Sequence, residues 1–107
     1  MFRICNNKGF LITFPNGVTL STQFGGGDNC QNFEDPVEIN LAGKKCVDSE
    51  IAVMDREGRW RTSEAMALAG KPAHAGDVAG HVTVDLWCRL VNACLQLPDE
   101  PDELKNP

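Results

Sequence analysis

Apolar and polar residues alternate along two runs, 10–14 and 18–24, whose sequences are FLITF and VTLSTQF. Alternation with a period of two is typical of β-strands that bury one face. The runs are separated by Pro15-Asn16-Gly17, and asparagine followed by glycine is a frequent turn sequence. We therefore predict a β-hairpin over residues 10–24.

Two turns are compatible with this hairpin, and they distribute the apolar residues differently. A two-residue loop at Asn16-Gly17 would place the apolar residues of the two strands on opposite faces. In a three-residue loop, Pro15 and Asn16 form a type I turn and Gly17 adopts the left-handed conformation. Phe14 then pairs with Val18, and the large apolar residues gather on one face. We predict the three-residue loop.

Further strands follow from the same alternation. Residues 49–55 place Ile51 and Val53 on one face, and the Glu57-Gly58 turn leads into a second short hairpin with Trp60 on its buried side. Ile4 is expected in an edge strand. These segments predict an antiparallel sheet of three to five strands.

Helical periodicity appears in the second half of the chain. Residues 63–69 begin with a capping serine and stop at Gly70, which predicts a short helix. A longer helix is predicted over 84–96, with Thr83 as its N-cap and Pro98 limiting its extension. Its apolar stripe consists of Leu86, Trp87, Leu90, Val91, Cys94 and Leu95. We expect this helix to pack across one face of the sheet, with a loop over 70–81.

The chain has 107 residues, which suits one domain with its own apolar core. The predicted architecture is a single α+β domain over residues 1–97. Residues 98–107 are rich in proline and acidic residues, and we expect a disordered tail there.

Five cysteines without a C-x-x-C pair argue against a disulfide framework and against the common zinc-binding motifs. We interpret them as reduced thiols in a cytoplasmic protein. The amino terminus lacks the apolar stretch of a signal peptide, and no apolar run approaches the length of a membrane span. We therefore predict a soluble monomer without a membrane partner.

The formal net charge is −5, and no stretch of the chain is enriched in lysine or arginine. Proteins that bind nucleic acid neutralise phosphates with basic side chains, so direct binding to nucleic acid is not expected. A partner with a basic surface would be favoured electrostatically.

The sequence GGGDNC at 25–30 lacks the continuations of a P-loop or a dinucleotide-binding loop. We interpret the glycines as the end of the hairpin, with Asp28 closing a turn. Cys30 together with a histidine remains an alternative nucleophilic site. Metal binding would have to recruit Cys30, Cys46, His74 or His81. Because their spacing matches no known motif, we predict neither a metal nor a cofactor.

Acidic residues are frequent between the first hairpin and the second. They form either a solvated surface or an interaction surface that competes with nucleic acid for a basic groove. The candidate partner-binding residues are Asp28, Glu34, Asp35, Glu38, Asp48, Glu50, Asp55 and Glu57.

Several short motifs together resemble a family of small acidic proteins encoded by phages and mobile elements. They are KGFLITFPNGVTLSTQFG followed by NCQN, then SEIAVMD and GRW, within roughly the first sixty residues, with GHVTVDLW as a looser match. This family includes inhibitors of bacterial defence, and the chain is similar to type I anti-CRISPR proteins. Such inhibitors often bind the effector complex and block target DNA, some by mimicking its charge.

The resemblance implies a non-catalytic inhibitor of a type I CRISPR–Cas effector complex in the host cytoplasm. The acidic residues would contact a basic DNA-binding surface of the complex. Two alternatives remain: a small enzyme or modifying protein that uses Cys30 with a histidine, and a phage protein without a role in defence.

Overall fold

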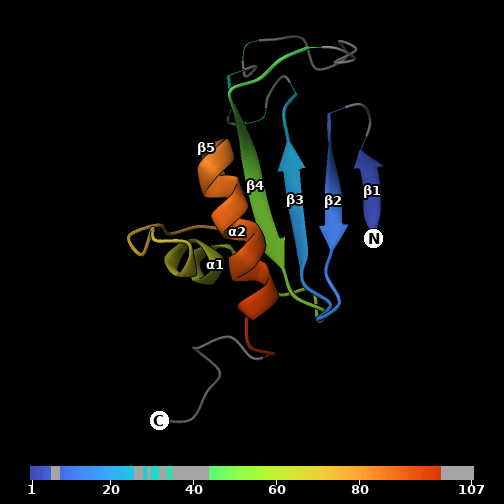
Figure 1. The fold of residues 1–107 in the computed structure, drawn as a ribbon, viewed down its shortest axis with the longest axis vertical. Coiled ribbons are helices and arrows are strands. Elements are labelled where there is room, and N and C mark those ends of the chain that lie inside the picture. The colour runs from blue at the N-terminus through green and yellow to red at the C-terminus, as the bar shows by residue number, and fades with distance from the viewer. Residues whose placement is uncertain (6–7, 26–27, 29, 32–33, 35–43, 100–107) are drawn as a thin grey trace.

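A computed structural model describes residues 1–5, 8–25, 28, 30–31, 34 and 44–99. Within these residues, five antiparallel strands form one sheet, and two helices accompany it (Figure 1). The strands are β1 (Phe2–Cys5), β2 (Gly9–Thr13), β3 (Thr19–Gln23), β4 (Asp48–Met54) and β5 (Ala79–Thr83). The helices are α1 (Thr62–Leu68) and α2 (Val84–Gln96). The predicted α+β class is therefore confirmed.

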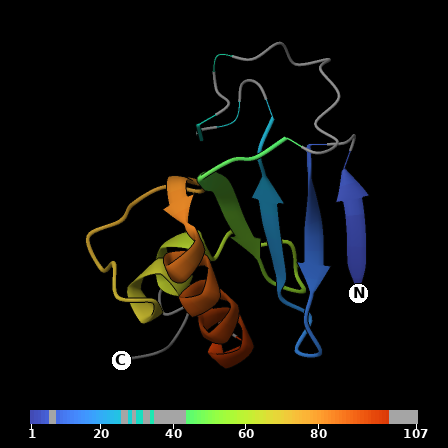
Figure 2. The same ribbon diagram turned by 45° about the horizontal axis from the view of Figure 1, so that its top comes forward.

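The sheet is a meander, because each strand pairs with the next in sequence, in the order β1-β2-β3-β4-β5. Helix α2 packs on one face, on the side of β4 and β5, with α1 beside it (Figures 1 and 2). The same face carries no helix over β1 and β2 (Figure 2). A partly covered sheet of this kind leaves part of its apolar face at the surface.

The turn between β2 and β3 is the predicted three-residue loop. The Phe14 and Val18 positions are joined by a 2.8 Å bond from the Phe14 N–H to the Val18 carbonyl, and Gly17 has a φ of 84°. Asn16 holds the turn from both sides: its Oδ1 accepts from the Val18 N–H, and its Nδ2 donates to the Cys94 carbonyl at 2.8 Å. The turn is thereby fixed to the last helix.

The core lies between α2, α1 and strands β3 to β5. Helix α2 matches the predicted bounds, and its N-cap is Thr83, although the Thr83 hydroxyl donates to Asp85 instead of capping the backbone. The fully buried apolar side chains include Leu20, Ile51, Val53, Ala65, Leu90 and Cys94. Burying each leucine, isoleucine or valine stabilises the fold by roughly 1.5–3 kcal/mol relative to exposure, so this core is a main source of stability.

One prediction for the long helix was wrong. Leu95 was placed in the apolar stripe, but 49% of it is exposed. Ala93 and Leu97 occupy buried positions instead. The buried face is therefore rotated slightly relative to the stripe that the large residues suggest.

Trp60 is also on the side opposite to the predicted one, with 49% of its surface exposed. The hairpin after β4 forms as expected, and Trp60 pairs with Met54 across it. Met54 faces away from the core because it alternates with buried Val53, so its partner shares that outer face. Arg61, the next residue, takes the inward position and is 1% exposed.

The predicted loop over 70–81 ends earlier than expected, because β5 begins at Ala79. The pairing of β5 with β4 shifts register between Ser49 and Ile51. As a result Ala79 and Val82 both face inward with two exposed residues between them, and the period-two signal is lost. His81, one of those two, has a φ of 52°.

Helix α1 begins one residue before the predicted serine. Thr62 is its first residue, and its hydroxyl donates to the Asp77 carbonyl at 2.7 Å while accepting from the Val53 N–H. At the other end of the domain, the carbonyls of Pro98 and Asp99 accept hydrogen bonds from Arg61 and Arg59. These two residues of the predicted tail are therefore attached to the domain, and residues 100–107 lie outside the described part.

Candidate functional site

The predicted acidic residues separate into two groups along β4. Asp48 and Glu50 lie where β4 begins, close in the fold to the turn of Asp28 after β3, while Asp55 and Glu57 follow its far end. A strand of this length spans roughly 20 Å, so the two groups do not form one continuous surface. Glu34 is exposed, and Asp35 and Glu38 lie outside the described residues.

Asp55 belongs to the interior of the protein. It is 8% exposed, and its Oδ2 lies 2.8 Å from Arg59 Nε and 3.2 Å from Arg61 Nη1. Burial alone would raise the pKa of this carboxyl, but hydrogen bonds from Arg59 and Arg61 outweigh it, and its pKa lies below the ordinary value. Asp55 therefore stabilises the domain and offers little surface to a partner.

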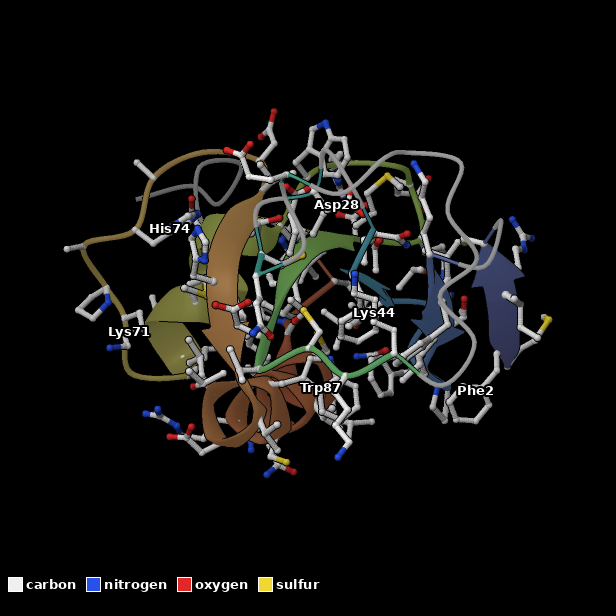
Figure 3. All side chains as sticks on the ribbon, turned by 90° about the horizontal axis from the view of Figure 1, so that it is seen from above. Phe2, Asp28, Lys44, Lys71, His74 and Trp87 are labelled. Atoms are coloured by element: carbon white, nitrogen blue, oxygen red, sulfur yellow. The ribbon has the colours of Figure 1, made fainter. Side chains whose placement is uncertain are left out.

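The end of the sheet that carries Asp28 and Asp48 has a mixed charge. Asp28 closes a turn by accepting the Gly25 N–H at 2.8 Å, as the sequence predicted. Lys44 and Lys45 are exposed in the segment that leads into β4, and Figure 3 shows Lys44 and Asp28 at this end. The acidic residues here are thus accompanied by basic ones.

Apolar side chains gather on the part of the sheet that α2 leaves uncovered. The strand register pairs Phe2 with Ile12 and Ile4 with Phe10, which places all four on the face of α2. Phe2 is 74% exposed and Ile4 81% exposed. We call the residues Phe2, Ile4, Phe10, Phe24 and Trp87 the aromatic surface.

Ring contacts connect the aromatic surface to α2. The ring centroids of Phe10 lie 6.4 Å from Phe2 and 6.2 Å from Trp87, in tilted and edge-on geometries that aromatic pairs prefer. Figure 3 shows Phe2 and Trp87 on the same side of the sheet. The indole Nε1 of Trp87 donates to Thr22 Oγ1 at 2.8 Å, which holds the ring in place.

A cavity of about 200 Å³ opens between the aromatic surface and the start of β4. Phe10, Phe24 and Trp87 line one side of it, and Cys46 and Asp48 line another. Val47 and Val84 also line it and are 66% and 71% exposed. The site is therefore a largely apolar depression with a polar border.

At the polar border, Cys46 and Asp48 lie close to a second cysteine, Cys30. The Sγ atoms of Cys30 and Cys46 and a carboxylate oxygen of Asp48 all lie within 4.8 Å of one another. His81 Nδ1 lies 3.1 Å from Asp48 Oδ2. Cys30, Cys46 and His81 were predicted only as separate possible ligands, and the fold brings all three close to Asp48.

The alternative of a nucleophilic Cys30 gains little from this geometry. Cys30 is 2% exposed, whereas a nucleophile has to reach its substrate. His81 Nδ1 lies 3.1 Å from the Asp48 carboxylate, which is how a carboxylate orients a general base, so the low exposure of Cys30 is the observation against this alternative. The prediction that the protein is not an enzyme remains a prediction.

Comparison of the chain with family models, with curated proteins and with solved structures gives no match. Among the helices of the described residues, none has the length and apolar character needed to cross a bilayer. The site is therefore interpreted from its own geometry and from the motifs of the sequence.

The sequence analysis missed the aromatic surface. Its signal was present, because Phe2 and Ile4 alternate at the amino terminus and continue the pattern of the predicted hairpin. The register extends that pattern across β1, β2 and β3, while α2 is too narrow to cover all of it. The uncovered remainder could not be located before the position of the helix was known.

Proposed function

We propose that this protein is a non-catalytic inhibitor that binds a type I CRISPR–Cas effector complex in the cytoplasm of the host bacterium and blocks recognition of target DNA. The observation that carries the binding role is the aromatic surface. Monomeric proteins seldom expose contiguous apolar patches, and such patches are typical of interaction sites. Aromatic residues are also enriched at the centres of protein interfaces.

The identity of the partner rests on the motif resemblance and on charge. A net charge of −5 favours approach to a basic DNA-binding surface. Asp28 and Asp48 lie at the end of the sheet next to the cavity, where they would attract lysine and arginine residues around an apolar contact.

Steric obstruction is better supported than DNA mimicry as the mode of inhibition. A mimic needs carboxylates spaced along a continuous surface, but the described acids divide between the ends of β4, and Asp55 is paired internally. The aromatic surface would supply the binding energy, and the bulk of the domain would exclude DNA. The protein would act as a monomer.

The test is a gel-shift assay with a purified type I effector complex and a labelled target duplex. We expect wild-type protein in molar excess to abolish the shift. The double variant Phe2→Ser, Ile4→Ser should weaken inhibition at least tenfold without unfolding the domain, because both side chains are exposed. Leu68→Ser is the matched control, since Leu68 is 53% exposed on α1, outside the aromatic surface.

The outcomes separate the two parts of the proposal. If target binding persists at a large molar excess of wild-type protein, the inhibitor function is wrong. If wild-type protein inhibits and the Phe2, Ile4 variant inhibits equally well, the function stands and the aromatic surface is not the contact.

A further inference from the structure

Beside the cavity lies a set of possible metal ligands whose two cysteines the proposed function does not use. Cys30 follows β3, and Cys46 and Asp48 lead into β4, so the fold brings two distant segments together here. Their two sulfur atoms and a carboxylate oxygen lie within 4.8 Å of one another. In a tetrahedral zinc site, with bonds of about 2.0–2.3 Å, ligand atoms are about 3.5–3.8 Å apart. A contraction of at most roughly 1.3 Å would bring the three atoms to these separations.

Backbone contacts hold these two segments in register. The Gln31 N–H donates to Asp48 Oδ1 at 2.6 Å, and the Gln31 side-chain carbonyl accepts the Val47 N–H at 2.8 Å. This reciprocal pair fixes the residue after Cys30 against the two residues after Cys46. The three candidate ligands are therefore positioned by the fold.

His81 holds the other carboxylate oxygen of Asp48 from β5. Its Nδ1 lies 3.1 Å from Oδ2, and its backbone φ of 52° is uncommon for a residue other than glycine. His81 lies where the pairing of β4 and β5 shifts register, and from there its ring reaches Asp48. Ligating carboxylates in metal sites are commonly oriented by such an outer hydrogen bond.

We propose that Cys30, Cys46 and Asp48 bind one Zn²⁺ ion, with His81 as the positioning residue for Asp48. Two thiolates and one carboxylate suit a borderline-soft divalent ion, whereas Ca²⁺ and Mg²⁺ require oxygen ligands. Asp48 and Cys46 are partly exposed, so a solvent molecule completes the coordination from the cavity side. This site does not depend on the proposed inhibitory function.

A disulfide between Cys30 and Cys46 is the competing arrangement of the same sulfurs. A disulfide would need no carboxylate beside it and no imidazole to orient that carboxylate. The position of the Asp48 carboxylate beside both sulfur atoms, with His81 orienting that carboxylate, therefore favours the metal.

The experiment uses the full chain, purified under reducing conditions, stripped with a chelator and loaded with Zn²⁺ or with Co²⁺ as a spectroscopic probe. We expect one ion per chain by elemental analysis after desalting. The Co²⁺ form should show thiolate charge-transfer bands and the strong visible bands of a tetrahedral site. Zn²⁺ should also raise the melting temperature, because only the folded chain holds the assembled site.

Variants assign the ligands. Cys46→Ser and Asp48→Asn should each weaken Zn²⁺ affinity at least tenfold, measured by competition with a chromophoric chelator, and Cys46→Ser should also weaken the charge-transfer bands. His81→Ala should lower affinity about 10–100-fold while retaining those bands, as expected for a residue that acts through Asp48. Cys88→Ser is the matched control, since Cys88 is exposed on α2 away from the cluster. Circular dichroism before loading verifies that each variant folds.

The proposal is overturned if the reduced wild-type chain retains no Zn²⁺ after desalting. It is equally overturned if Cys46→Ser binds as tightly as Cys88→Ser. If the reduced chain binds no metal and peptide mapping of chain purified without reductant finds Cys30 and Cys46 in one cross-linked peptide, the pair is a disulfide and the metal site is excluded.

Discussion

Replacing Arg61 by methionine should strongly destabilise the domain, because its guanidinium is the centre of a buried ion-pair network. The side chain is 0% exposed, and Nε and Nη2 contact the Glu64 carboxylate at 2.8 and 3.1 Å. Nη1 contacts Asp55 at 3.2 Å, and Nη2 also donates to the Pro98 carbonyl at 2.9 Å. Methionine retains the apolar volume and removes all four contacts.

Breaking one partner out of a buried ion pair costs about 3–5 kcal/mol, because the remaining charge loses its compensation. Asp55 keeps its contact with Arg59, and Glu64 is 23% exposed, so we expect the lower end, about 3 kcal/mol. For a domain of this size that corresponds to a fall in melting temperature of more than about 10 °C.

Urea denaturation followed by tryptophan fluorescence and circular dichroism measures this loss. Arg89→Met is the matched control: Arg89 is 50% exposed, lies 3.6 Å from Asp85 and donates to the Ala69 carbonyl at 3.1 Å, so its loss should cost about 1 kcal/mol. A loss below about 1 kcal/mol for Arg61→Met, or one equal to the control, would show that the network does not stabilise the fold.

Three further predictions concern single positions. The pKa of Asp55 is lowered in the folded state, so as the pH falls the unfolded chain, in which this pKa is near 3.8, takes up the proton first. The free energy of unfolding therefore decreases as the pH drops through the folded pKa. Asp55→Asn should make the urea midpoint less dependent on pH in this acid range, and an unchanged pH dependence would contradict the ion pair. Gly9→Ala should destabilise the fold by about 3 kcal/mol, because the new Cβ would lie 2.8 Å from the Gln23 Cα. Gly58→Ala, which has open space around it, should cost about 1 kcal/mol for its left-handed backbone. Equal urea midpoints for the two variants would refute the close approach of β2 and β3. If the proposed function holds, Glu34→Lys should weaken inhibition at low salt and converge on wild type as salt rises, and a deficit independent of salt would exclude an electrostatic role for Glu34.

Local patterns predicted the elements whose residues alternate regularly. The hairpin over 10–24 followed from placing Phe14 opposite Val18, and α2 followed from its caps and apolar spacing. The predicted orientation of Trp60 was wrong because the side of the sheet that it faces depends on which β4 residue it pairs with. Its hydrophobicity alone suggested a buried position. Strand β5 was not predicted because a register shift against β4 removes the regular alternation of buried and exposed residues along it.

The two surface features required the tertiary structure. The aromatic surface exists because α2 lies over one side of the sheet and not over Phe2 and Ile4. The cluster of Cys30, Cys46 and Asp48 exists because the end of β3 lies beside the start of β4 in the antiparallel sheet. No spacing rule indicates either one, because both depend on how segments far apart in the sequence approach each other.

The contact between Asn16 and Cys94 has a consequence for how the chain folds. A meander sheet is built from neighbouring hairpins, so its strands can pair early through local contacts. The core that contains Leu20 and Ile51 is completed by α2, however, and Asn16 reaches a residue 78 positions away. During synthesis the sheet would therefore remain without its main packing partner until the last helix emerges. A chain that stops before α2 would expose the part of the apolar face that α2 covers, which makes such a chain prone to aggregate.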